Sequence, residues 1–64
     1  MAHFDNWKKS PEFWVMRQGK VTASDAMRYY GISQEDAVRM LDNLVRDRRL
    51  AKFTEAGMTW WKRP

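Results

Sequence analysis

Residues 22–49 constrain the fold most strongly, because they predict two helices joined by a tight turn at Gly31. The second helix has a clear start: Ser33 is a favourable N-cap, and Asp36 follows three residues later, as in a capping box. We therefore expect this helix to begin at Gln34. Mostly apolar residues then recur at intervals of three and four, which places them on one core-facing stripe. This predicted stripe contains Ala37, Leu41, Leu44, Val45 and Arg48, with Val38 at its margin.

The other side of this second helix is polar. Glu35 and Arg39, and likewise Asp42 and Arg46, are acid-to-base pairs at the i,i+4 spacing that stabilises exposed helix faces. We expect both pairs to form within the helix and to face solvent.

The helix before Gly31 has its own start signal, since Thr22 is a candidate N-cap and Asp25 adds negative charge to the first turn. Gly31 ends this helix, because glycine adopts the left-handed conformation that follows a helix without steric cost. Two helices joined by a short turn with glycine form a helix-turn-helix. An ordinary pair of packed antiparallel helices would also fit this pattern.

An earlier helix is predicted by Ser10, Pro11 and Glu12, which supply an N-cap, a proline at the first helical position and an acid in the first turn. This helix should run from residue 11 to about residue 18 and stop at Gly19. We expect Phe13 and Trp14 to anchor it on the two later helices. Residues 1–9 are interpreted as an N-terminal arm, and residues 10–64 as one domain.

The C-terminal part predicts a β-hairpin, with strands at residues 50–53 and 58–62 and a connection at residues 54–57 that ends in glycine. Side chains alternate between the two faces of a strand, so Trp60 and Trp61 should lie on opposite faces. One of them should be buried, and the pattern leaves open which one. Residues 20 and 21 are expected to be a short extended link, long enough for one residue of β-bridge.

Three helices followed by a hairpin give an α+β, mainly α, fold of the winged helix-turn-helix type: three helices plus a C-terminal two-stranded wing. From Val21 onward the chain resembles small winged helix-turn-helix proteins of bacteria and phages, most closely the FaeA-like regulators of fimbrial operons. The matching positions are Thr22, Ala26, Ala37, Leu41, Leu44, Arg46, Leu50 and residues 57–59 with the aromatic residues that follow. Such proteins usually have glycine between the third helix and the wing, where this chain has Arg48 and Arg49.

Enzymatic chemistry has no recognisable motif in this sequence. The chain has no cysteine, its one histidine lies in the N-terminal arm, and no phosphate-binding loop, nucleophile motif or metal-ligand spacing is present. We therefore expect no enzyme activity, no cofactor and no metal. The absence of cysteine and of long apolar runs indicates a soluble, cytoplasmic protein without a membrane segment.

DNA binding is the function that the resemblance and the net charge of +4 together favour. In this arrangement the third helix lies in the major groove and the wing approaches the DNA backbone. The predicted base-reading residues are Ser33, Gln34, Arg39 and Asn43. The predicted phosphate contacts are Arg28, Arg46, Arg49, Lys52, Lys62 and Arg63. For each of these side chains the alternative interpretation is a solvated surface residue. The expected partner is double-stranded DNA, and the expected role is transcriptional regulation.

One feature opposes this hypothesis. Residues 33–48 contain three arginines and four acidic residues, so the predicted recognition helix has a net charge of −1, whereas a helix that enters DNA should not be acidic. The alternative function is a winged-helix module that binds another protein through exposed tryptophan and methionine side chains. The sequence predicts no oligomeric state.

Overall fold

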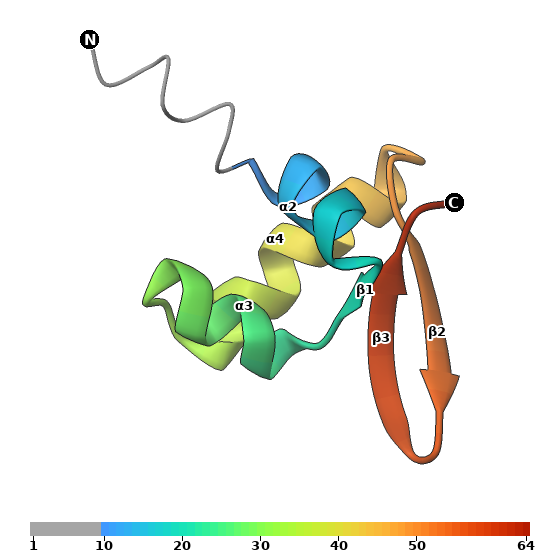
Figure 1. Cartoon of the computed structure of the whole chain (residues 1–64). Helices are drawn as coiled ribbons and strands as arrows, with labels where there is room; N and C mark the ends of the chain where they lie inside the picture. The colour runs from blue at the N-terminus through green and yellow to red at the C-terminus, as the bar shows by residue number, and fades with distance from the viewer. Residues whose placement is uncertain (1–9) are drawn as a thin grey trace, which may run out of the picture.

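The computed structural model describes residues 10–64, and the predicted arm at residues 1–9 lies outside the described part. The elements in chain order are α2 (Pro11–Gln18), β1 (Lys20–Val21), α3 (Ala23–Tyr30), α4 (Gln34–Arg46), β2 (Ala51–Glu55) and β3 (Met58–Lys62). Figure 1 shows the three helices on one side of a small sheet at the C-terminal end of the chain. The fold is α+β and mainly helical, with the predicted winged-helix layout.

The three predicted helix starts are confirmed by their capping interactions. The Ser10 and Ser33 hydroxyls accept hydrogen bonds from the backbone N–H groups of residues 13 and 36. Thr22 and Asp25 form a complete capping box, in which each side chain accepts from the other residue's backbone N–H at 3.2 and 3.0 Å. These contacts satisfy donors that a helix start leaves unpaired. The capping residues therefore fix where each helix begins.

The sheet has three strands in the order β1-β3-β2, and both pairings are antiparallel. The extended link predicted at residues 20 and 21 forms β1 and pairs with β3 at both residues, so the sheet has one strand more than the predicted two-stranded wing. The predicted four-residue connection was wrong: β2 continues to Glu55, leaving a two-residue turn at Ala56 and Gly57. Both turn residues have positive φ, 55° and 77°, as a type I′ hairpin turn requires.

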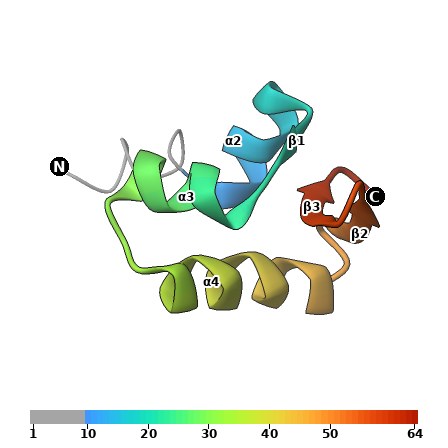
Figure 2. The ribbon, with the colours of Figure 1, turned by 90° about the horizontal axis from the view of Figure 1, so that it is seen from below.

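The core lies between the helices and one face of the sheet, and Figure 2 shows from below how the helices lie beside the sheet. Trp61 is the buried tryptophan of the hairpin, with 2% of its surface exposed. Val15 of α2 is fully buried and the predicted anchor Trp14 is nearly so, whereas the predicted anchor Phe13 is only partly buried. The fully or nearly fully buried apolar side chains are Trp14, Val15, Val21, Ala26, Ala37, Leu41, Leu50 and Trp61.

The prediction that Arg48 belongs to the core stripe of α4 was wrong. The helix ends at Arg46, with Asp47 as its C-cap, so the helical spacing no longer applies at Arg48. Arg48 is exposed and has φ 64°, the left-handed conformation that favours glycine. The left-handed Arg48 lies in the turn between α4 and β2.

The aromatic rings of Trp14, Tyr29 and Tyr30 pack together between α2 and α3. The Trp14 and Tyr29 rings are stacked, with centroids 4.9 Å apart, and Tyr30 meets both rings edge-on. Burial, and then the neighbouring Tyr29, raise the pKa of Tyr30 from 10.0 to about 12. Packing at this position therefore favours the neutral phenol.

This shift predicts a specific loss of stability in alkali. A raised folded-state pKa stabilises the protein fully below the unfolded pKa of 10.0, and the contribution is lost as the pH rises through about 12. Urea unfolding between pH 9 and 12 should show the free energy of unfolding falling more steeply for the wild type than for Tyr30→Phe. Parallel pH profiles for the two proteins would contradict the assignment to Tyr30.

Candidate nucleic-acid interface

The outward side of α4 is the first part of the candidate interface, because no described element covers it. Glu35, Asp36, Arg39, Asn43 and Arg46 are all exposed there, while Ala37 and Leu41 on the opposite side are fully buried. Helical spacing places these exposed residues along one face. This face is therefore free to contact a partner over about three turns of helix.

A groove lies beside this face, where α3, α4 and the hairpin meet. It has a volume of about 340 Å³, and we call it the hairpin groove. It is lined by Thr22, Ala23, Ser24, Gln34, Val38, Lys52, Met58, Thr59 and Trp61. Hydroxyl, amide and ammonium groups from three separate elements thus line one groove, and such groups commonly contact phosphate and sugar oxygens in protein–DNA complexes.

The four predicted base-reading residues lie on one part of the surface, but their side chains make different contacts. Gln34 lines the groove, and Ser33 is exposed at the start of α4, with its hydroxyl capping the helix. Arg39 is neutralised within the helix, because its guanidinium lies 3.8 Å from Glu35 and 3.5 Å from Asp36. This distance to Glu35 confirms the predicted Glu35–Arg39 pair. The amide oxygen of Asn43 accepts a hydrogen bond from Arg46.

The predicted Asp42–Arg46 pair was wrong. Asp42 faces the hairpin, where it accepts a hydrogen bond from Trp61 Nε1 at 3.2 Å and forms an ion pair with Lys52 at 3.2 Å. The Lys52 ammonium also lies 5.4 Å from the centre of the Trp61 ring. Asp42 therefore joins α4 to both strands of the hairpin, and Lys52 reaches the groove with its charge already paired.

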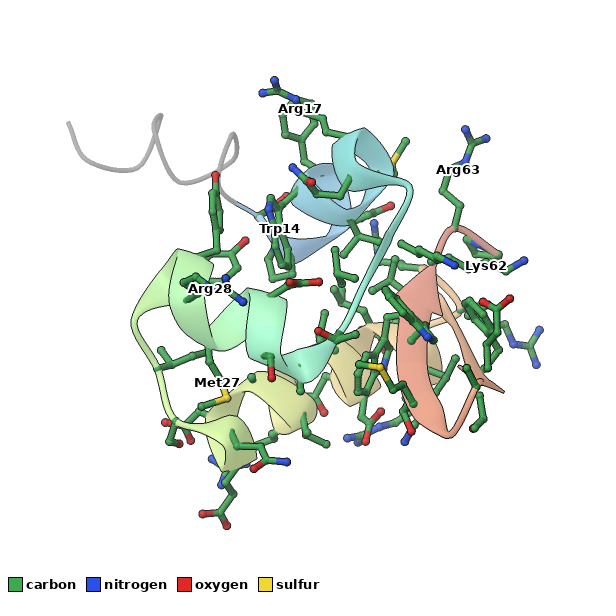
Figure 3. All side chains as sticks on the ribbon, turned by 60° about the horizontal axis from the view of Figure 1, so that its bottom comes forward. Trp14, Arg17, Met27, Arg28, Lys62 and Arg63 are labelled. Carbon is green, nitrogen blue, oxygen red and sulfur yellow. The ribbon has the colours of Figure 1, made fainter. Side chains whose placement is uncertain are left out.

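The other predicted phosphate contacts do not gather at the hairpin groove. Arg28 lies beside Trp14 between α2 and α3, and Lys62 and Arg63 lie at the end of β3 away from the hairpin turn (Figure 3). Arg49 is held by Glu12 of α2 at 2.9 Å. Only Lys52 of this predicted set lines the groove, because the fold distributes the basic residues over several faces.

Five of the ten cations in residues 10–64 have no carboxylate of this same range within ion-pair distance. They lie near the ends of α2, α4 and β3, and they are Arg17, Arg46, Arg48, Lys62 and Arg63. Of these five, Arg46 alone is on the outward side of α4. The unpaired positive charge of the described chain is therefore greatest away from the groove.

Sequence reasoning missed Ser24 and Thr59, which line the hairpin groove. Ser24 is an exposed residue in the first turn of α3, and the alternation of β3 already placed Thr59 on the same face as Trp61. The alternation was thus a usable signal for Thr59. Nothing in the local sequence brings the start of α3 to the hairpin, so Ser24 required the tertiary structure.

Among the described residues, no group of three or more histidine, cysteine or acidic side chains is arranged to hold a metal ion. No helix in the same part of the chain has the length and apolar character needed to cross a membrane. Comparison with known proteins gives no match to any family model, curated protein or solved structure. The resemblance to the FaeA-like regulators therefore stays a prediction.

Proposed function

We propose that this protein is a small cytoplasmic DNA-binding regulator that inserts the N-terminal half of α4 into the major groove of duplex DNA. The start of α3 and the hairpin would contact the flanking sugar-phosphate backbone. The observation that carries the proposal is the uncovered outward side of α4 beside a groove of hydroxyl, amide and ammonium groups. This is the surface with which helix-turn-helix proteins meet DNA.

The ion pairs at this surface determine how binding should behave. Arg39 must leave Glu35 and Asp36 before it can contact a base, and Lys52 must leave Asp42 before it can contact a phosphate. Each exchange replaces a carboxylate with a DNA group. We therefore expect weak binding to random DNA, with tight binding only where a guanine gives Arg39 two hydrogen bonds.

The test is a salt series of duplex binding, measured by fluorescence anisotropy at low ionic strength. Lys52→Gln should lower the slope of log K against log salt by about 0.9 and should weaken all duplexes alike. Arg39→Ala should cost about 1–3 kcal/mol on a selected cognate duplex while hardly changing affinity for random DNA. Glu35→Gln is the matched variant, and it should strengthen binding to random DNA because it removes one of the two carboxylates that pair with Arg39.

A protein-binding module is the second candidate, favoured by the pairing of Arg39 and Lys52 with acids at the surface that would face DNA. Met58, which lines the groove and is 49% exposed, would then contact the partner protein. If the protein shows no salt-dependent affinity for any duplex at low ionic strength, the DNA proposal is excluded and the protein-binding module remains.

A further inference from the structure

The outer face of the three-stranded sheet is the face opposite Trp61, and near the hairpin turn its residue Met58 also lines the hairpin groove. The strand register places Lys20 of β1 beside Lys62 of β3, and Phe53 of β2 beside Trp60 of β3. Register partners share a face, and side chains two residues apart along a strand also share it. Lys20, Phe53, Trp60 and Lys62 therefore lie together on the face opposite the buried Trp61. Trp61 belongs to one core cluster with Trp14 of α2, Ala26 of α3 and Leu41 of α4, so the helices pack on the Trp61 face. Figures 1 and 2 show the helices on one side of the sheet.

Each of the two aromatic rings, Trp60 and Phe53, has a lysine ammonium group above its face. The Lys20 ammonium lies 4.5 Å from the centre of the Trp60 ring, and the Lys62 ammonium lies 5.3 Å from the centre of the Phe53 ring. Lys20 extends across Trp60 to Glu55 on β2, where the two charges are 3.0 Å apart. This ion pair is exposed, so it contributes little to stability and can exchange with another anion.

Two further features of this face concern hydrogen bonding and charge. Trp60 Nε1 is covered from solvent and has no hydrogen-bond partner among residues 10–64. Lys62 and the neighbouring Arg63 have no acidic partner in the same part of the chain, and Figure 3 shows Arg63 extending away from the end of β3. The face thus combines adjacent ring surfaces with excess positive charge, and among residues 10–64 Glu55 is its one acidic side chain.

We propose that the outer face, composed of Lys20, Phe53, Trp60 and Lys62, binds single-stranded nucleic acid. Lys20 leaves Glu55 for a phosphate, which opens the Trp60 ring to a base, and Lys62 leaves Phe53 in the same way. Stacking of bases on aromatic side chains together with lysines along the backbone is how proteins bind single strands without sequence preference. A duplex does not fit this mode, because its bases are already stacked.

An acidic polypeptide is the competing ligand, and the sheet disfavours it. A peptide that binds a sheet by adding a strand would lie along the outer edge of β1 or β2, whereas Trp60 is on β3, which lies between β1 and β2. The rings and ammonium groups at the centre of the outer face instead match flat bases joined by phosphates. The charge and the aromatic rings together therefore favour a nucleic acid.

The experiment measures anisotropy of a fluorescent twelve-nucleotide oligothymidylate with the full chain at about 20 mM salt. Lys20→Gln and Lys62→Gln should each weaken binding roughly tenfold and lower the salt slope by about 0.7. Trp60→Leu should weaken binding about tenfold or more through lost stacking. Glu55→Gln should strengthen it, because Glu55 no longer competes for Lys20. Oligouridylate, measured in parallel, distinguishes DNA from RNA as the source of the strand.

Lys52→Gln is the matched control, since Lys52 is a lysine of the same sheet on the opposite face. It should weaken duplex binding under the proposed function and leave oligothymidylate binding unchanged, so the two proposals can fail separately. Circular dichroism would verify that each variant is folded. The inference is overturned if oligothymidylate does not bind, if Lys20→Gln and Lys62→Gln both bind as the wild type does, or if polyglutamate competes as well as the oligonucleotide.

Discussion

Leu41→Ala should destabilise the protein by about 2–5 kcal/mol, the range for truncating a deeply buried leucine. Leu41 is fully buried in the centre of α4, where it belongs to the same core cluster as Trp14, Val21 and Trp61. The substitution removes apolar contacts and leaves a cavity that a close-packed core fills poorly. A domain of this size has little stability to spare, so we expect urea unfolding to show a population of unfolded protein even without denaturant.

Glu35→Ala is the control for this prediction, since it lies on the same helix and faces solvent. Its ion pair with Arg39 is exposed, so its removal should cost only about a few tenths of a kcal/mol. Equal losses for the two substitutions would show that the faces of α4 are assigned incorrectly.

Gly31→Val should destabilise the turn between α3 and α4 by about 2 kcal/mol or more, because a β-branched residue is strongly disfavoured in the left-handed region. Gly31 has φ 67°, and a Cβ added there would meet no atom within 4 Å. The cost is therefore one of backbone strain, without a steric clash against neighbouring residues. Urea unfolding followed by circular dichroism measures it.

Gly31→Asn is the matched variant, because asparagine tolerates the left-handed conformation better than other residues with a side chain. It should retain most of the stability that Gly31→Val loses. If valine and asparagine at this position were equally stable, the turn would not have the positive φ described here.

Arg48→Gly should change the free energy of unfolding in the opposite direction and stabilise the protein by about 0.5–1 kcal/mol. Glycine relieves the left-handed strain at this position, although it also adds chain entropy to the unfolded state. The same exchange within the helix, Arg39→Gly, should cost about 1 kcal/mol. Equilibrium unfolding of the two variants compares one substitution at two backbone conformations. A destabilised Arg48→Gly would show that the arginine side chain contributes more than its backbone conformation costs.

The starts of the helices were predictable because capping is local. Ser10, Thr22 and Ser33 each bond to a backbone N–H three residues later, so a short stretch of sequence holds all the necessary information. The core stripe of α4 was predictable for the same reason as far as the helix extends. It failed at Arg48, where the helix had already ended.

The partners of Asp42 could not be predicted from its neighbours in the sequence. Its sequence neighbours indicated an intrahelical pair with Arg46, yet Trp61 and Lys52 approach it from the hairpin and satisfy both of its oxygens. Of the predicted DNA contacts, the sequence placed Ser33, Gln34, Arg39 and Asn43 together because they share one helix. It could not place Lys62 or Arg28, whose positions depend on how separate elements pack.

The sequence by itself thus determined the helices, the turn at Gly31, the hairpin and the alternation of Trp60 and Trp61, because each depends on residues within a few positions of one another. The tertiary structure alone decided that Trp61 is the buried tryptophan, that β1 joins the sheet beside β3, and that Lys20 lies across Trp60. These contacts join residues about 20 to 40 positions apart. Their physical cause is the packing of one sheet face against the helices, which buries Trp61 and leaves Trp60 on the outer side.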